Sequence, residues 1–134
     1  MNTVIDSSII AKWYLVDEDQ TEEALKLRSL HIESKITISA PALLLLEIGN
    51  VFVTRKLEQK DFDANIEGLL DLQINFLEPD SFTLKNTFSF ARQLHLSYYD
   101  ATYIALAKSL KCDFITADKK LVEATKKLKF VKLL

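Results

Sequence analysis

Short β-prone runs alternate with longer helical segments along the whole chain, and this alternation constrains the fold more than any other feature. The longer segments carry apolar residues at three- and four-residue intervals, which predicts amphipathic helices. Strands separated by helices predict a mainly parallel sheet, covered on both faces and wound with right-handed crossovers. The expected strands are Thr3–Ile5, Ile36–Ser39, Asn75–Leu77, Phe114–Thr116 and Phe130–Leu133. The expected helices are Ser8–Leu15, Thr21–Lys35, Pro41–Lys56 with Pro41 in its first turn, Lys60–Gln73, Ser81–Leu94, Asp100–Leu110 and Lys119–Leu128.

The length of 134 residues predicts one domain with a single hydrophobic core. We find no repeat, low-complexity tract or linker that would divide the chain. The N-terminus has no basic region before an apolar run and soon reaches an acid, and the longest apolar run, near Ala42–Leu46, is too short to cross a membrane. We therefore expect residues 1–134 to form one three-layer α/β/α domain with about five strands, in the cytoplasm and away from membranes.

Glycine, cysteine and histidine are scarce, and their scarcity excludes several kinds of site. The 2 Gly residues, Gly49 and Gly68, lie too far apart for a Walker loop or a dinucleotide-binding fingerprint. The chain has 1 Cys and 2 His, which form neither a Cys-rich zinc site nor a two-histidine metalloprotease motif. It has 19 acidic side chains, so a bound metal is expected to be a hard cation with oxygen ligands.

Two acidic residues lie at or just beyond the ends of predicted strands, at the edge where parallel α/β sheets bind ligands. Asp6 closes the first strand, and Asp118 follows the strand Phe114–Thr116 with one residue between them. Each of these acids also precedes a predicted helix. N-capping of that helix is therefore the alternative interpretation for both.

Two further acids lie among apolar or aromatic residues in predicted helices. Glu47 stands in a segment that is apolar on nearly all sides, where an ionised carboxylate is costly unless it is paired or bound to a metal. The alternative is a narrow polar stripe that Glu47 shares with Asn50 and Thr54. Asp100 follows two tyrosines at a predicted helix start, where it acts as a cap or as a ligand; Ser97 is the other candidate cap.

Together, these four acids predict a metal site at the carboxyl edge of the sheet. Carboxylates a few ångströms apart repel one another, and a divalent cation between them keeps them ionised. Because no His or Cys ligand accompanies them, oxygen coordination favours Mg²⁺ or Mn²⁺ over zinc. Such sites typically act on phosphate esters, with metal-activated water as the nucleophile.

Four short segments around these acids match a known family. They are Val4–Ser8 followed by Lys12 and Trp13, Pro41–Ile48, Tyr99–Ala101 and Thr116–Asp118. They resemble the PIN-domain ribonucleases, and more narrowly the VapC toxins of bacterial and archaeal toxin–antitoxin pairs. The resemblance extends over essentially the whole chain. It implies a Mg²⁺-dependent endoribonuclease built on a parallel sheet flanked by helices.

The resemblance also implies a role for each acid. Asp6 and Asp100 match the family's Mg²⁺ or Mn²⁺ ligands. Glu47 and Asp118 match the acids that complete the cluster, directly or through water. All four are therefore the expected catalytic and metal-binding residues.

Three further residues match positions that support the site in the family. Ser8 and Thr116 match positions that carry hydroxyl groups. Lys12 matches a basic residue that often follows the first acid, where it would approach a phosphate. The alternative for Lys12 is a lysine solvated on the helix surface.

The resemblance implies an RNA substrate, a homodimer and a small antitoxin partner. The segment Ala42–Val53 has more apolar surface than one helix–sheet contact needs, which fits a homodimer or antitoxin face, or else a fully buried helix. The net charge of −2 leaves only a local basic patch for RNA. That patch, or else an ordinary solvated helix face, comprises Lys119, Lys120, Lys126, Lys127, Lys129 and Lys132.

Other functions are weaker matches. A PIN-like chain can also be a non-catalytic scaffold or an RNA-processing module without a toxin role. A phospho-accepting receiver domain needs an adjacent acidic pair after the first strand, but Ile5 and Ser7 flank Asp6. A haloacid-dehalogenase-type phosphatase needs a second Asp where Ser8 stands.

Overall fold

Five parallel strands form one sheet in the computed structural model, which describes all 134 residues of the chain. The strands are β1 (Asn2–Ile5), β2 (Thr37–Pro41), β3 (Asn75–Leu77), β4 (Asp113–Thr116) and β5 (Val131–Leu133). Their order across the sheet is β3-β2-β1-β4-β5, and every neighbouring pair is parallel. The predicted parallel sheet is confirmed.

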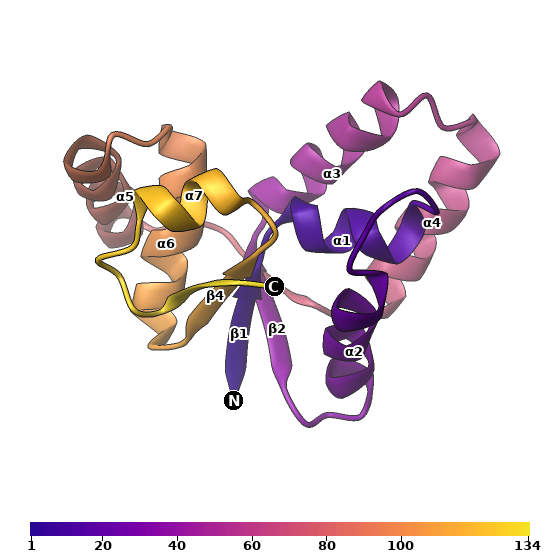
Figure 1. Cartoon of the computed structure of the whole chain (residues 1–134), viewed down its shortest axis with the longest axis horizontal. Helices are drawn as coiled ribbons and strands as arrows, with labels where there is room; N and C mark the ends of the chain where they lie inside the picture. Colours follow the sequence, from indigo (N-terminus) through magenta and orange to yellow (C-terminus); the bar gives the residue numbers. More distant parts are fainter.

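Helices lie on both sides of this sheet. They are α1 (Ser7–Tyr14), α2 (Thr21–Ile32), α3 (Leu43–Thr54), α4 (Gln59–Asp71), α5 (Ser81–Leu94), α6 (Tyr98–Leu110) and α7 (Lys119–Ala124). In Figure 1, α1, α2 and α4 lie to the right of the strands, and α5, α6 and α7 lie to the left. This arrangement confirms the three-layer α/β/α architecture. None of the helices is both long enough and apolar enough to cross a lipid bilayer.

Helices α2 and α7 show the largest differences from the predicted helix ends, Lys35 and Leu128. Helix α2 stops at Ile32, and Ser34 just beyond it has a φ of 58°. Helix α7 stops at Ala124 instead of continuing to Leu128. There the buried Thr125 hydroxyl donates to the Leu121 carbonyl at 2.7 Å, and the chain turns so that Val131 pairs with β4. In both helices the chain must turn to reach the next strand, and this overrides the local helical pattern.

Pro41 lies in a strand and not in the first turn of a helix, which corrects the prediction made for it. It is the last residue of β2, opposite Leu77 of β3. Proline has no N–H to donate to a neighbouring strand. The next residue, Ala42, makes this bond instead, donating to the Leu77 carbonyl at 2.9 Å. Helix α3 therefore begins two residues after Pro41.

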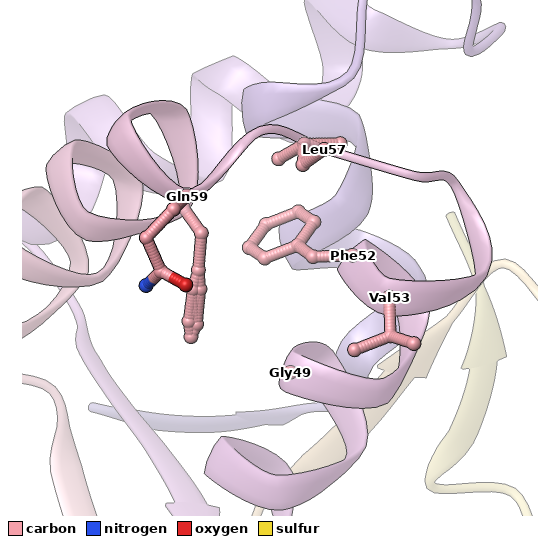
Figure 2. A pocket seen from close by; sticks show the side chains of 6 residues that line it. Gly49, Phe52, Val53, Leu57 and Gln59 are labelled. Atoms are coloured by element: carbon pink, nitrogen blue, oxygen red, sulfur yellow. The ribbon is translucent and has the colours of Figure 1, made fainter.

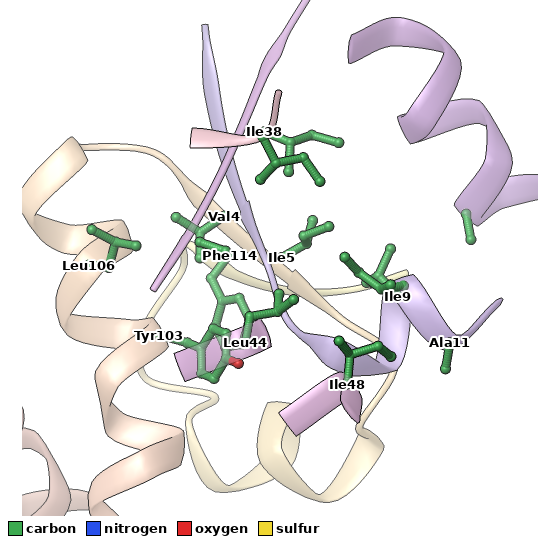
Figure 3. Close-up of a cluster of buried hydrophobic side chains, with 14 of the residues drawn as sticks. Val4, Ile5, Ile9, Ala11, Ile38, Leu44, Ile48, Tyr103, Leu106 and Phe114 are labelled. Atoms are coloured by element: carbon green, nitrogen blue, oxygen red, sulfur yellow. The ribbon is translucent and has the colours of Figure 1, made fainter. Parts of the chain in front are cut away.

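Strand β1 is at the centre of both the sheet and the hydrophobic core. Val4 and Ile5 are fully buried, and their side chains point to opposite faces because successive strand residues alternate. Phe114 of β4 lies opposite Val4 and is also fully buried. Figure 3 shows these strand residues between Ile9 of α1 and Tyr103 of α6. The core therefore fixes the first helix after β1 and helix α6 against the same two strands.

The loop between α1 and α2 is held by Lys12. Only 4% of this residue is exposed, and its ammonium donates to the carbonyl and to the carboxylate of Asp19, each at 2.8 Å. Glu18 Oε1 lies 3.8 Å from the same nitrogen. The prediction of a solvated lysine is therefore wrong. The ammonium is also engaged by the loop and is not free to approach a phosphate, because the acids after α1 fold back over the helix.

We expect Asp19→Ala to destabilise the protein more than Lys12→Met does. Removing Asp19 leaves a buried ammonium without its main anion, whereas Lys12→Met keeps the packing and returns an exposed carboxylate to water. Lys12→Met should lower the free energy of unfolding by less than about 2 kcal/mol. Urea denaturation measures both changes. The double variant is the control and should be no less stable than Asp19→Ala; a larger loss for Lys12→Met would contradict this account.

Candidate active site

The order of the strands reverses between β1 and β4, and the predicted residues gather at this point. The chain passes from β1 through β2 to β3 on one side, and then returns to β4 and β5 on the other. The connections after β1 and β4 therefore leave the sheet toward opposite faces, which opens a crevice beyond the carboxyl ends of these strands. Asp6 follows β1 and Asp118 follows β4, so both acids lie at this crevice.

Asp6 caps α1 and is surrounded by hydrogen-bond donors. Its Oδ1 accepts from the Ser8 N–H at 3.1 Å and from the Ser8 hydroxyl. Its Oδ2 accepts from the Thr116 hydroxyl at 2.5 Å. N-capping, the alternative interpretation of Asp6, is therefore confirmed, and the cap also faces the crevice. Both predicted supporting hydroxyl groups contact this one carboxylate.

The same two hydroxyl groups connect Asp6 to the turn that carries Asp118. The Ser8 Oγ accepts from the Ala117 N–H at 2.9 Å, and the Thr116 Oγ1 accepts from the Asp118 N–H at 3.1 Å. Asp118 in turn caps α7, where its Oδ1 accepts from the Leu121 N–H at 3.1 Å. The turns after β1 and β4 are thus joined by side chains, which fixes the separation between Asp6 and Asp118.

Helices α3 and α6 supply the other two acids. Ser97 caps α6 by accepting from the Asp100 N–H at 3.0 Å, so the cap is Ser97 and Asp100 lies in the first turn. Glu47 of α3 is half-buried, and its Oε1 accepts from the Tyr103 hydroxyl at 2.6 Å. The sequence does not single out Tyr103 as a site residue. The available signal is its spacing of three residues from Asp100, which places both on one face of α6.

The four carboxylates affect one another electrostatically. Burial raises the pKa of Asp6 to about 6, against the hydrogen bonds of Ser8 and Thr116, and the charge of Glu47 adds to the rise. Burial also raises the pKa of Glu47, to which the charge of Asp100 contributes. The pKa of Asp100 is raised by burial and then by the charge of Asp118. Each acid therefore has another as a neighbour, and no lysine or arginine lowers the pKa of Asp6, Glu47 or Asp100.

This donor set fits a hard divalent cation. All the available ligand atoms are carboxylate and hydroxyl oxygens, and like charges crowded together favour a cation between them. The side chains do not form a preformed group of three ligands around one point. Asp6, Asp100, Glu47 and Asp118 are the residues that would hold Mg²⁺ or Mn²⁺.

Helix α3 has an exposed apolar side next to Glu47. Leu46 is 76% exposed and Val53 is 75% exposed, so the alternative of a fully buried helix is wrong. A hollow of about 420 Å³ beside Glu47 is lined mainly by this helix and by Tyr99. Asn50 and Thr54, the other members of the predicted polar stripe, are exposed, whereas Glu47 turns inward to Tyr103.

A second hollow lies between α3 and α4 and contains none of the predicted residues. Its volume is about 340 Å³, and Figure 2 shows Phe52 and Leu57 at its wall with Gln59 opposite. Gly49 leaves its α3 side open, because no atom lies within 4 Å of where a Cβ would be. This hollow is mainly apolar and differs in chemistry from the crevice with the acids.

The C-terminal lysines divide into paired and unpaired groups. Lys126 contacts Glu123 at 3.3 Å, and Lys132 contacts Asp113 at 2.8 Å. Lys119 and Lys120 are exposed, form no ion pair and come directly after Asp118. A local positive patch therefore begins beside one of the four acids. The remaining exposed lysines, further along the chain, are Lys127 and Lys129.

Comparison with protein families matches residues 3–127 to the PIN domain. Among curated protein sequences, no significant match is found. The family match of residues 3–127 includes Asp6 and Asp118, which follow β1 and β4, and the two helices that carry Glu47 and Asp100.

Several solved structures share the fold. VapC20 of Mycobacterium tuberculosis, described as a toxin that cleaves the sarcin–ricin loop, has a TM-score of 0.72 at 16% identity, with 96% of this chain and 96% of that chain covered. PAE2754 of Pyrobaculum aerophilum has a TM-score of 0.69 at 19% identity, with 94% and 81% covered. VapBC2 of Rickettsia felis, bound to a DNA fragment from its promoter, has a TM-score of 0.69 at 14% identity, with 100% and 98% covered.

Asp6 should make the stability of the metal-free protein depend on pH. Its pKa is about 6 in the folded protein against an ordinary value of 3.8. Between these two pH values the folded protein keeps a proton on Asp6 that the unfolded protein has released. The protonated Asp6 therefore contributes its full stability below about pH 4, and this contribution is lost as the pH rises through about 6. Asp6→Asn does not titrate. In EDTA, its free energy of unfolding relative to the unchanged protein should rise from about pH 4 to about pH 7, by at most about 3 kcal/mol.

Urea denaturation at several pH values measures this difference. Because both proteins share every other titratable group, the pH effects of groups distant from Asp6 cancel in the comparison. The coupling between Asp6 and Glu47 is part of the measured difference. A difference that does not change with pH would show that Asp6 is not held at a raised pKa.

Proposed function

Because the chain belongs to the PIN-domain family, we propose that it is a Mg²⁺- or Mn²⁺-dependent endoribonuclease that hydrolyses phosphodiester bonds of RNA. The observation that carries this proposal is the meeting of four acids from different parts of the chain at the crevice between β1 and β4. The charges of Glu47, Asp100 and Asp118 each contribute to raising the pKa of another of these acids. Acids in this arrangement, with no cation from the protein among them, suit metal-assisted chemistry on phosphate esters.

In this proposal each residue has a distinct part. Asp6 and Asp100 hold the divalent ion, and Glu47 and Asp118 complete its surroundings directly or through water. The bound ion supplies positive charge that activates water and neutralises the charge developing on the phosphate. Ser8 and Thr116 fix the direction of the Asp6 carboxylate through their hydroxyl groups.

The RNA backbone is the proposed partner of the exposed lysines. Lys119 and Lys120 come directly after Asp118. The positive charges of both lysines would therefore attract a phosphate that lies near the acids. Contacts of this kind give affinity without reading the sequence of the RNA. The net charge of −2 is compatible with this, because only the local patch needs to be positive.

We further propose that the chain is the toxin of a toxin–antitoxin pair in the cytoplasm. The support is the shared fold with VapC20 and VapBC2, together with the exposed apolar side of α3. A small antitoxin seated over Leu46 and the hollow beside Glu47 would cover this side and exclude RNA from the acids. A homodimer that buries the remaining apolar surface belongs to the same proposal.

The second candidate is a non-catalytic scaffold or an RNA-processing module without a toxin role. It is favoured by one observation, that the carboxylates do not form a preformed group of three ligands. Such a protein would bind RNA or Mn²⁺ without turnover. Cleavage assays and Mn²⁺ binding, carried out on the same preparation, separate the two candidates.

We expect Asp6→Asn and Asp100→Asn each to reduce RNA cleavage in Mg²⁺ on the order of 100-fold or more, because each removes a proposed ligand. The matched control is Asp113→Asn. Asp113 starts the same strand that leads to Asp118, but it lies at the opposite edge of the sheet and contacts Lys132. Cleavage is measured as the initial rate on a labelled single-stranded or loop RNA, and circular dichroism checks that each variant is folded.

The control variant should cleave at the unchanged rate, and EDTA should stop the unchanged protein. Normal cleavage by both site variants, in preparations free of contaminating nuclease, would contradict the proposal that Asp6 and Asp100 are metal ligands.

A further inference from the structure

Tyr103 is the one buried hydroxyl-bearing aromatic residue whose polar atom contacts the acids. Only 2% of the residue is exposed, and its hydroxyl donates to Glu47 Oε1 at 2.6 Å. The contact joins α6 to α3 over a sequence separation of 56 residues. This hydrogen bond uses the Oε1 atom of Glu47. The Oε2 atom of the same carboxylate has no hydrogen-bond donor from the protein.

The ring of Tyr103 is held firmly in place. It stacks on Phe114 with the ring centres 5.5 Å apart and the planes at 14°. Phe114 is fully buried in β4 and lies opposite Val4 of β1. Figure 3 shows Tyr103 of α6 and Phe114 of β4 among the buried side chains of the core. The position of the hydroxyl is therefore set by the two central strands and not by a flexible side chain.

The surroundings keep this phenol protonated. Burial raises the pKa of Tyr103 far above its ordinary value, and the hydrogen bond to Glu47 and the charges of Glu47, Asp6 and Asp100 raise it further. The hydroxyl therefore stays a neutral donor. A neutral donor orients a carboxylate without cancelling its charge, whereas a lysine in the same place would compete with a metal ion.

We propose that Tyr103 is a positioning residue that fixes the direction of the Glu47 carboxylate, so that its Oε2 is presented to the divalent ion. This inference rests on the proposed function. Ligand carboxylates commonly depend on hydrogen bonds from outside the metal's own ligands, and loss of such a bond typically weakens metal affinity or activity by 10–100-fold. Because Tyr103 lies three residues after Asp100 on α6, its hydrogen bond also ties Glu47 to the helix that carries Asp100.

The test is Mn²⁺ binding to Tyr103→Phe, measured by titration calorimetry or by the electron paramagnetic resonance signal of free Mn²⁺. The substitution keeps the ring and its stack on Phe114 and removes only the hydroxyl. We expect the dissociation constant for Mn²⁺ to rise about 10-fold or more. The melting temperature in EDTA should change little, since the ring remains in place.

The matched control is Tyr14→Phe. Tyr14 also carries a buried hydroxyl, but that hydroxyl has no hydrogen-bond partner. It lies on α1 next to Gly68, in contact with none of the four acids. Removing this hydroxyl should leave Mn²⁺ affinity unchanged. The control therefore separates the contact with Glu47 from the general effect of deleting a buried phenol.

A second comparison shows whether Tyr103 acts through Glu47. In a Glu47→Gln background, Tyr103→Phe should weaken Mn²⁺ binding no further, because the carboxylate that it directs is gone. A purely structural role would instead give the same fold loss in both backgrounds, and that result would overturn the inference.

Two other results would also overturn it, and they can be told apart from failure of the proposed function. If the unchanged protein binds Mn²⁺ and Tyr103→Phe binds it equally well, or if Tyr103→Phe is unfolded in EDTA, the positioning role fails while the proposed nuclease stands. If the unchanged protein itself binds no Mn²⁺, the proposed metal site fails and this inference fails with it.

Discussion

The burial of carboxylates near one another at the carboxyl edge of the sheet is the constraint on which the rest of the site depends. The reversal of strand order brings Asp6 and Asp118 to one crevice, and α3 and α6 add Glu47 and Asp100. Burial and neighbouring charge raise the pKa of three of them. The fold therefore holds these three carboxylates partly out of water and near other negative charges, and both effects favour their protonated forms.

The groups that hold these charges in place are themselves neutral. Asp6 accepts from a backbone N–H and from the hydroxyls of Ser8 and Thr116, and Glu47 accepts from the Tyr103 phenol. Lys12, on the helix that Asp6 caps, donates to Asp19 and not to these acids. These neutral donors orient the carboxylates without cancelling their charge, and in Asp6 and Glu47 they lower the pKa by less than burial raises it.

Local sequence patterns were sufficient to predict the five strands, the parallel sheet and the places of Asp6 and Asp118 at its carboxyl edge, because both acids follow strands. The grouping of all four acids around a metal ion stays a prediction. The same patterns mislead where a distant contact decides the structure. Pro41 extends a strand because Leu77 lies beside it, and Lys12 is buried because a loop folds over it. Tyr103 resembles any apolar helix residue until α3 is placed opposite it. Such contacts depend on the packing of elements, which no short window of sequence contains.

The capping arrangement makes the acids unequal as places to alter the chain. Asp6 both starts α1 and faces the crevice, so a replacement that cannot cap a helix, such as Ala, changes how the first helix is anchored. Asp100 also lies at the start of a helix, but it does not cap that helix, because Ser97 is the cap of α6. Under the proposed function, an inactive variant that keeps its helix caps is therefore most simply made at Asp100, because the proposed metal ligand and the cap of α6 are different side chains.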